Sequence, residues 1–420
     1  MNGMAETAQL EAAVQALSDI VKMNTVNNHE PLVADYLVTL LKLHGIEAQS
    51  IEYAPGRVNL VAEIGDGHGP VVALDGHEDT VALGDADKWH TDPLAATIKD
   101  NRLYGRGVTD MKAGLMAEVF AMIALHDQDV PLHGTVRLLA TVGEEVDHLG
   151  AEQLTELGYA DDIQTLICAE PSGADKQLLL TKSIQAMLGV DDDTAQRMAD
   201  ANPTTEQHFI ELAHKGSLTY TIKAQGVAAH SSMPAIGQNA IDMLMTYYQK
   251  QTAYFDSFKT IVNPVLGPTV PVVTLISGGE QVNTVPASAE MSVKIRTIPE
   301  LRNDRLIKDL EAIIAECNAD GANLTMDIAS SFYPVHTPED SQLVQLAKKV
   351  GEQVLQQRLP YFGAPGGTDA SSYIVKSPDM QVIVFGPGNI TAHQVNEYVD
   401  LDMYGRFIEI YQKMITELLA

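Results

Sequence analysis

Four apolar runs in this 420-residue chain each end in, or lead directly into, residues that can bind a metal ion. Their sequences are VVALDGHEDTV (71–81), TVRLLATVGEE (135–145), TLICAEP (165–171) and QVIVFGPGNITAH (381–393). Runs so rich in Val, Leu and Ile, separated by helix-like segments, predict buried parallel strands of an α/β sheet. Because such sheets bind ligands beyond the carboxyl ends of their strands, we expect the polar residues there to converge and form a hydrolytic metal centre. These residues are His77, Asp79, Glu144, Glu145, Glu170 and His393.

The composition fits a globular protein with more than one domain. Hydrophobic residues make up 45% of the chain, enough to fill substantial cores. Its 27 basic and 56 acidic residues give a formal net charge of −29, which repels nucleic acid and anionic membrane surfaces. We therefore expect no nucleic acid and no membrane as partners. The start shows no basic segment followed by an apolar one, and no apolar run approaches the roughly 18 residues of a membrane span, so we expect a cytoplasmic protein.

The cysteine content limits how a metal can be held. Cys168 and Cys317 are the only cysteines, too few for a disulfide framework or a thiolate zinc cage. Any metal ion must therefore be bound by imidazole and carboxylate groups. We expect both cysteines to be small buried apolar residues.

The first part of the chain alternates between apolar runs and helix-like segments, up to about Pro171. Helices are expected at about 5–23, 30–44 and 111–126. This alternation predicts an α/β domain with a doubly wound, mixed but mostly parallel sheet.

A different pattern begins near residue 217. Strand, helix, two strands, helix and strand follow one another, which is the ferredoxin-like βαββαβ order. Because the run at 381–393 returns to the first pattern, we predict that this unit is inserted. The expected division is a discontinuous catalytic metal-binding domain of residues 1–214 and 332–420, with an inserted lid or dimerisation domain of residues 215–331. Between the two patterns, residues 184–214 form either a surface excursion or a lid or interface element.

His77 and Asp79 stand two positions apart on a predicted strand, so their side chains should leave by the same face. Asp79 could then accept a hydrogen bond from the imidazole and fix its tautomer, as is common at zinc sites. A single His-x-Asp is weak evidence in a chain with 13 histidines. Asp110 opens an apolar helix, where it is most simply an N-cap, although its two oxygens could also bridge two cations.

Glu144 and Glu145 end a buried apolar run. Adjacent residues in extended structure point to opposite sides, so one acid could bind metal while the other faces substrate. A solvated acidic pair is the ordinary alternative in so acidic a chain. Glu170 has the same position after a shorter run, and it could equally be a turn residue before Pro171.

Three further residues have both an ordinary interpretation and a functional one. His230 is most simply a loop histidine, and Arg296 a solvated arginine, although a guanidinium can also grip a carboxylate in two places. His393 follows a Gly-Pro-Gly turn in an irregular loop, where binding residues are often found.

Several motifs occur in one fixed order along the chain: GHEDTV, LYGRGVTDMKAGL, TVGEEVDHLGA, AEPSG, AAHSSMP and GPGNITAHQVNEY. Together they resemble the co-catalytic zinc metallohydrolases that include succinyl-diaminopimelate desuccinylase, acetylornithine deacetylase, aminoacylase and glutamate carboxypeptidases. The resemblance extends over nearly the whole chain, and it is closest to the desuccinylase and deacetylase branch. It implies a zinc-hydrolase domain with two zinc ions, for which cobalt or manganese could substitute. The ions would be held by His77 and Glu170, by Glu145 and His393, and jointly by Asp110.

The resemblance also implies catalytic roles. Asp79 would orient His77, and Glu144 would be the general base that takes a proton from water and returns it to the leaving amine. His230 would polarise the carbonyl oxygen in the transition state. In this family that histidine often reaches the site of a neighbouring subunit, which implies a homodimer formed through the inserted domain.

Substrate contacts follow from the same resemblance. Asn283 and Arg296 match positions that bind the carboxylate side of the substrate, while Gly367 and Thr368 match a glycine–threonine substrate loop. Desuccinylases usually continue this loop with Ser-Asp-Gly, whereas Asp369, Ala370 and Ser371 follow here.

We therefore predict a zinc-dependent amidohydrolase that cleaves the N-acyl amide of an acylated amino acid, of the succinyl-diaminopimelate desuccinylase or acetylornithine deacetylase type. The partner would be a small N-acyl amino acid or a peptide. A metal-dependent dipeptidase or carboxypeptidase on the same fold is the alternative, and a non-catalytic binding module is a third reading.

Overall fold

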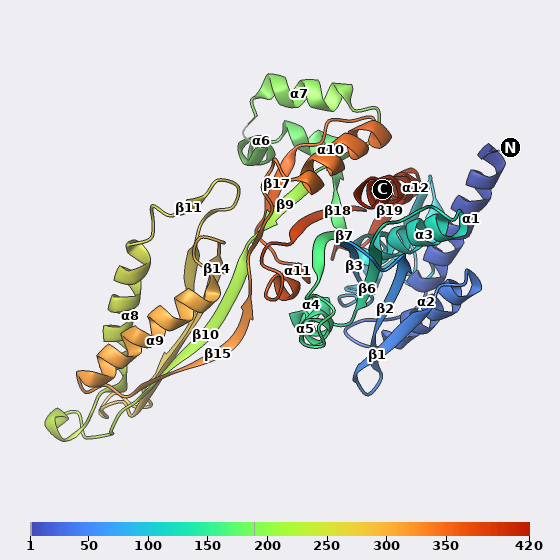
Figure 1. Cartoon of the computed structure of the whole chain (residues 1–420). Helices are drawn as coiled ribbons and strands as arrows, with labels where there is room; N and C mark the ends of the chain where they lie inside the picture. The colour runs from blue at the N-terminus through green and yellow to red at the C-terminus, as the bar shows by residue number, and fades with distance from the viewer. Residues whose placement is uncertain (1, 189) are drawn as a thin grey trace. The chain divides into compact units, whose positions relative to one another are not determined.

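The computed structural model describes residues 2–188 and 190–420, apart from the side chains of residues 2–7, 186 and 187. The chain divides into two compact units (Figure 1). The larger unit contains the residues up to Leu212, then His336–Phe362 and Thr368–Ala420. The smaller unit contains Ala213–Val335 and Gly363–Gly367.

The main sheet has ten strands, of which eight follow one another in the order β1-β2-β6-β3-β7-β18-β9-β16. Strand β17 pairs with β9, and β8 pairs with β7. Strands β9, β16 and β17 lie where the chain passes between the units. The bounds are β1 Ala48–Ala54, β2 Arg57–Gly65, β3 Val71–His77, β6 Thr135–Thr141, β7 Ile163–Asp175, β8 Glu206–His208, β9 Ile210–His214, β16 Val335–His336, β17 Tyr361–Ala364 and β18 Gln381–Asn389.

The centre of this sheet is parallel. Strand β3 pairs in parallel with both β6 and β7, and β7 pairs in parallel with β18. Strands β1, β2 and β6 are antiparallel neighbours. The mixed, mostly parallel α/β sheet expected from the apolar runs is thus confirmed. Because His77 is level with Thr141 in the register, the carboxyl ends of β3 and β6 meet at one edge.

Helix α3 (Ala113–Asp127) is buried from Ala113 to Leu125, and all of these residues except Glu118 are apolar. It packs between the sheet and helices α1 (Asn2–Val21) and α12 (Leu401–Leu418). A helix with no polar face has to be covered in this way. The other helices of the larger unit are α2 Pro31–Leu43, α4 Glu144–Asp147, α5 Leu149–Glu156, α6 Lys182–Leu188, α7 Asp192–Ala201, α10 Gln342–Leu355 and α11 Ala370–Tyr373.

A second, small sheet of the larger unit has the strand order β19-β5-β4. Its strands are β4 Thr97–Lys99, β5 Arg102–Tyr104 and β19 Tyr398–Asp400. Helices α6 and α7 form a satellite with its own core around Leu179, Met198 and Phe209. Helix α7 begins at the acidic stretch, where the Asp191 carboxylate accepts a hydrogen bond from the Thr194 backbone N–H.

The smaller unit is an antiparallel sheet with the strand order β13-β14-β10-β15. Its elements follow the predicted βαββαβ order: β10 Gly216–Gln225, α8 Ala240–Asp256, β13 Val270–Gly278, β14 Ser288–Thr297, α9 Asn303–Ala319 and β15 Leu324–Phe332, with a short pair β11 Val262–Asn263 and β12 Gly267–Pro268 between α8 and β13. Helices α8 and α9 pack against each other and the sheet, around a core that includes Tyr220 and Tyr247.

Two findings concern the whole described chain. Both Cys168 and Cys317 are free and buried, as expected of small apolar residues. Across residues 2–188 and 190–420, no helix is both long enough and apolar enough to cross a membrane.

Candidate metal centre

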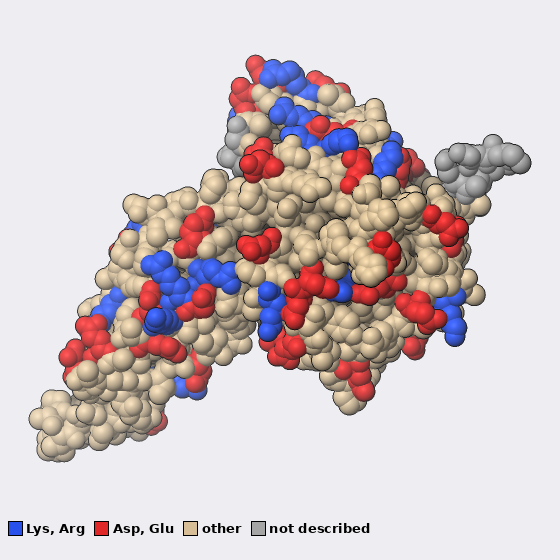
Figure 2. Space-filling view, in the orientation of Figure 1, with Lys and Arg blue, Asp and Glu red and all other residues tan. Residues whose placement is uncertain are grey.

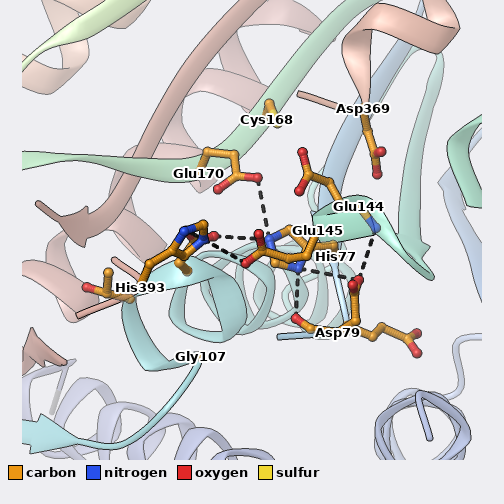
Figure 3. A network of polar contacts seen from close by, with 12 residues as sticks. His77, Asp79, Gly107, Glu144, Glu145, Cys168, Glu170, Asp369 and His393 are labelled. Atoms are coloured by element: carbon orange, nitrogen blue, oxygen red, sulfur yellow. Dashed lines mark hydrogen bonds and ion pairs between the residues drawn. The ribbon is translucent and has the colours of Figure 1, made fainter. Parts of the chain in front are cut away.

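The acids and histidines that follow the parallel strands lie together in the larger unit. Figure 3 shows the side chains of His77, Glu144, Glu145, Glu170 and His393 pointing toward one another. His77 is the last residue of β3, Glu170 lies in β7, and His393 follows β18. The geometric expectation from the four apolar runs is therefore met, because parallel strands deliver their ends to one edge.

Asp110 lies between the two imidazoles. Its Oδ1 is 3.1 Å from His77 Nε2, and its Oδ2 is 3.2 Å from His393 Nε2. The interpretation of this residue as a simple N-cap is wrong, because α3 begins only at Ala113. The carboxylate instead offers one oxygen to each histidine, which is the arrangement a bridging ligand requires.

Each imidazole also faces a second carboxylate. His77 Nε2 is 3.5 Å from Glu170 Oε1, and His393 Nε2 is 3.0 Å from Glu145 Oε1. Ligand atoms of His77, Asp110 and Glu145 lie within 4.8 Å of one another, as do those of a second group that contains His77, Glu144 and Glu170. Glu170 lies in a strand and is largely buried, so it is not a turn residue.

The donor types fit divalent cations. Imidazole nitrogens and carboxylate oxygens in this number suit zinc and related ions. Four carboxylates this close to one another repel when all are ionised, and a positive charge among them removes that cost.

Protons are the alternative source of positive charge. Burial, followed by the charge of Asp110, raises the pKa of Glu170 well above its ordinary value. Burial alone lowers the pKa of His77, but Glu170 and Asp110 together raise it well above its ordinary value. Hydrogen bonds to Asp110 and Glu145 raise the pKa of His393 to about 10. Without a metal ion the cluster therefore binds protons, which a divalent cation would displace.

The partner of His77 differs in one detail from the expectation. Its Nδ1 lies 2.9 Å from the backbone oxygen of Asp79, whereas the Asp79 carboxylate is 3.7 Å away. The reason is that β3 ends at His77, so Asp79 no longer follows the strand alternation. The Asp79 carboxylate instead accepts a hydrogen bond from the backbone N–H of Glu144 at 3.1 Å.

Glu144 and Glu145 do not lie on an extended strand, so that part of the prediction is wrong. Strand β6 ends at Thr141, Gly143 adopts a left-handed conformation with φ 67°, and helix α4 begins at Glu144. The helical turn still separates the two acids, since Glu145 faces His393 while Glu144 faces His77 and Glu170. Neither is a solvated acid, because their side chains are only 12% and 7% exposed.

Burial raises the pKa of Glu144 to about 8, although the neighbouring His148 and His77 lower it in part. The acid is therefore a strong proton acceptor once it is ionised. A raised pKa close to the working pH is what a general base needs.

Glu397 is a functional candidate that the sequence analysis missed. Its fully buried carboxylate accepts hydrogen bonds from the backbone N–H groups of Gly107, Thr109 and Asp110, at 3.1, 2.8 and 3.2 Å. It also accepts one from Arg106 Nη1 at 2.6 Å. These bonds fix the turn that carries Asp110. The sequence gives only a weak signal for this, because Glu397 follows the His393 loop and nothing local shows its partners.

The remaining predicted residues belong mainly to the smaller unit. His230 and Asn283 lie on paired segments, since His230 bridges to Thr284 and the Ser231 N–H donates to the Asn283 carbonyl at 2.9 Å. Arg296 lies in β14, opposite Ser217 of β10.

The glycine–threonine pair lies where the chain passes from one unit to the other. Gly367 belongs to the smaller unit, and Thr368 begins a segment of the larger unit. Thr368 is buried, and its Oγ1 accepts a hydrogen bond from the Ala370 N–H at 3.3 Å.

Comparison with known proteins adds independent information. Residues 73–417 match the sequence model of Peptidase family M20/M25/M40. A protein of Staphylococcus aureus strain MRSA252, named probable succinyl-diaminopimelate desuccinylase, is 36% identical over 427 residues, which cover 95% of this chain and 96% of that protein.

Solved structures share the fold. An M20 family metallo-carboxypeptidase of Sulfolobus solfataricus matches with a TM-score of 0.70 at 19% identity, covering 96% of this chain and 98% of that one. A dinuclear metal binding peptidase of Bacillus subtilis from the same family matches with a TM-score of 0.67 at 14% identity, covering 98% and 99%.

Proposed function

Because the chain belongs to peptidase family M20/M25/M40 and is thus a metallohydrolase of amide bonds, we propose that it removes a succinyl or acetyl group from the nitrogen of an amino acid. The observation that carries this proposal is the placement of Glu144 beside a cluster in which Asp110 offers one oxygen to each of two imidazoles. The succinyl group is favoured because the 36% identical relative is named as a probable desuccinylase.

The proposed centre would bind two zinc ions, with cobalt or manganese as substitutes. His77 and Glu170 would hold one ion, Glu145 and His393 would hold the other, and Asp110 would contribute one oxygen to each. The distances of about hydrogen-bond length between each imidazole and its two carboxylates support this division. When bound, the ions supply Lewis acidity, which polarises an amide carbonyl and makes water more acidic.

Glu144 carries the proton in this proposal. Its carboxylate accepts a proton from water as the water oxygen attacks the amide carbon, and then gives that proton to the leaving nitrogen. Its partly buried position and raised pKa support the role. Asp79 holds both residues in place. Its carboxylate accepts a hydrogen bond from the Glu144 backbone N–H, and its backbone carbonyl faces Nδ1 of His77 at hydrogen-bond distance.

Residues of the smaller unit would bind substrate. Arg296, on β14 and only partly buried, would bind a substrate carboxylate through its guanidinium. Asn283 and His230, on paired segments, would contact the carboxylate side and the carbonyl oxygen respectively. Gly367 and Thr368 would line the acyl group.

We also infer that the protein forms a homodimer through the smaller unit. Strand β13 is an edge of its sheet, contains no charged residue and exposes 69% of Leu275 and 62% of Ile276. The opposite edge, β15, carries Asp327, which pairs with Lys223 at the surface. In Figure 2 the end of this unit at the lower left of the view shows almost no charged residues. An apolar, uncharged edge strand favours pairing with a second copy.

A substrate panel tests the proposal. Zinc-loaded protein would be assayed with N-succinyl-diaminopimelate, N-acetylornithine, other N-acyl amino acids and simple dipeptides, with chelated protein and Glu144→Gln as controls. We expect metal-dependent cleavage of the succinyl substrate and a loss of at least 100-fold in kcat for the variant. Preference for dipeptides would instead assign the chain to the dipeptidase or carboxypeptidase group. No cleavage of any substrate would support a binding module. We also propose a cytoplasmic location, and a role in amino-acid biosynthesis that would follow from cleavage of the succinyl substrate.

A further inference from the structure

Glu144 has a neighbour outside the predicted site. His148 lies at the end of the same short helix, and its Nδ1 is 3.3 Å from Glu144 Oε1. The residue adopts a left-handed conformation, with φ 51°, at the junction between α4 and α5. This conformation is uncommon for a residue with a side chain, and it folds the buried imidazole back over the start of α4.

The same nitrogen faces a second acid. His148 Nδ1 is 3.1 Å from Asp369 Oδ1, and the Asp369 side chain is only 2% exposed. Asp369 Oδ2 accepts a hydrogen bond from Thr141 Oγ1 at 2.5 Å, at the end of β6. Figure 3 shows Asp369 on the Glu144 side of the cluster, away from His393. Asp369 follows the predicted substrate loop, but its carboxylate is engaged inside the protein.

These contacts determine what the imidazole can do. Nδ1 forms a hydrogen bond with Asp369 Oδ1 and an ion-pair contact with Glu144 Oε1, so a hydrogen on this nitrogen faces both carboxylates. Burial alone lowers the pKa of His148, but Asp369 and Glu144 raise it to about 9, which keeps the ring protonated at neutral pH. Because Thr141 and His148 occupy both Asp369 oxygens, the aspartate fixes the orientation of the ring.

We propose that His148, held by Asp369, positions the carboxylate of Glu144 for proton transfer. The N–H of His148 binds Glu144 Oε1 and leaves Oε2 as the oxygen that takes the proton from water. His148 and Asp369 are positioning residues and do not contact the substrate. The inference rests on the proposed role of Glu144 as the general base.

Two substitutions of His148 distinguish the effect of its side-chain N–H from the effect of its left-handed backbone conformation. Glycine and asparagine both tolerate the left-handed conformation, but only asparagine keeps an N–H close to the position of Nδ1. We expect His148→Gly to lower kcat for N-succinyl-diaminopimelate by about 10–100-fold, with little change in KM or in metal content. His148→Asn should recover most of this loss. Asp369→Asn should also lower kcat, because a neutral amide holds the protonated imidazole more weakly than a carboxylate does.

The readouts distinguish this proposal from other roles. Equal kcat in the parent and His148→Gly, or equal losses in the glycine and asparagine variants, would overturn it. A loss of metal from His148→Gly, measured by elemental analysis, would also overturn it, because His148, Glu144 and Asp369 would then form a cation site. Glu144→Gln is assayed in parallel. If that variant keeps its activity, the proposed function itself fails; if it is inactive while His148→Gly equals the parent, only the positioning role fails.

Discussion

At the scale of single residues, the centre depends on carboxylates whose two oxygens have different partners. Asp110 divides its oxygens between His77 and His393, and Asp369 divides its oxygens between His148 and Thr141. A side chain tied at both oxygens has little freedom to rotate. Such ties allow several acids to remain close together without turning away from one another.

Glu397 should control metal binding without being a ligand. Glu397→Gln replaces one accepting oxygen with an amide nitrogen that faces backbone N–H donors, and thus loosens the turn that carries Asp110. We expect metal affinity to fall by about 10–100-fold, measured by titration calorimetry of the chelated protein. The exposed Glu409→Gln is the matched control. Unchanged affinity in Glu397→Gln would show that the turn holds without the carboxylate.

The sequence could indicate His77, Glu144, Glu145, Glu170 and His393 because each follows an apolar run, whereas Asp110 precedes one. Their convergence is a property of parallel strands, which local sequence predicts well. Glu397 and Asp369 could not be identified in this way, because their partners come from distant segments and include backbone groups. Those contacts exist only once the chain has folded.

At the scale of elements, the expected side-chain directions were wrong where a strand ends earlier than the sequence suggested. The alternation rule applied to His77 with Asp79, and to Glu144 with Glu145, requires extended backbone through both residues. Strands β3 and β6 end at His77 and Thr141 instead. The chain turns into α4 at Gly143, which has a positive φ. Residues with a side chain rarely adopt this conformation, whereas glycine adopts it readily.

The buried imidazole of His208, in the short strand β8, should make the stability of the fold depend on pH. Burial lowers the pKa of its imidazole from the ordinary 6.5 to about 3, so the ring is neutral in the folded protein at neutral pH. The unfolded chain binds a proton near pH 6.5. The stability contributed by the neutral buried ring is therefore complete above pH 6.5 and is lost as pH falls toward 3.

Substitution tests this linkage. The difference in unfolding free energy between the parent and His208→Gln should shrink between pH 6.5 and 4.5, by up to about 1.4 kcal/mol per pH unit. Chemical denaturation of both proteins in chelator gives the difference, and the exposed His68→Gln serves as the surface control. A difference that stays constant with pH would contradict the assignment.

At the scale of the whole molecule, the order of elements was readable from the sequence, including the βαββαβ unit. Its periodic apolar positions form a core of their own, so local pattern and tertiary packing agree. Assembly is less readable, because an edge strand differs from a central strand only in what covers it.

The proposed dimer predicts different results at the two sheet edges. Leu275→Lys places a charge on the apolar edge β13 and should convert a dimer into a monomer. Ile328→Lys, at a position 43% exposed on the opposite edge β15, should leave the dimer intact. Light scattering after size-exclusion chromatography measures both masses. A monomeric parent, or dissociation caused by Ile328→Lys alone, would contradict the assignment of β13.

In the proposed mechanism, two metal ions bound in one cluster enable amide hydrolysis. The most direct measurement is the initial rate of N-succinyl-diaminopimelate cleavage as zinc is titrated into chelated protein, with bound zinc quantified in each sample. We predict no turnover without metal, and a rate that reaches its plateau near two bound ions per chain. The Asp110→Asn variant should reach neither the plateau rate nor two bound ions. Turnover in the chelated protein, or full turnover with no metal ion bound at this cluster, would contradict the proposed metal-dependent mechanism.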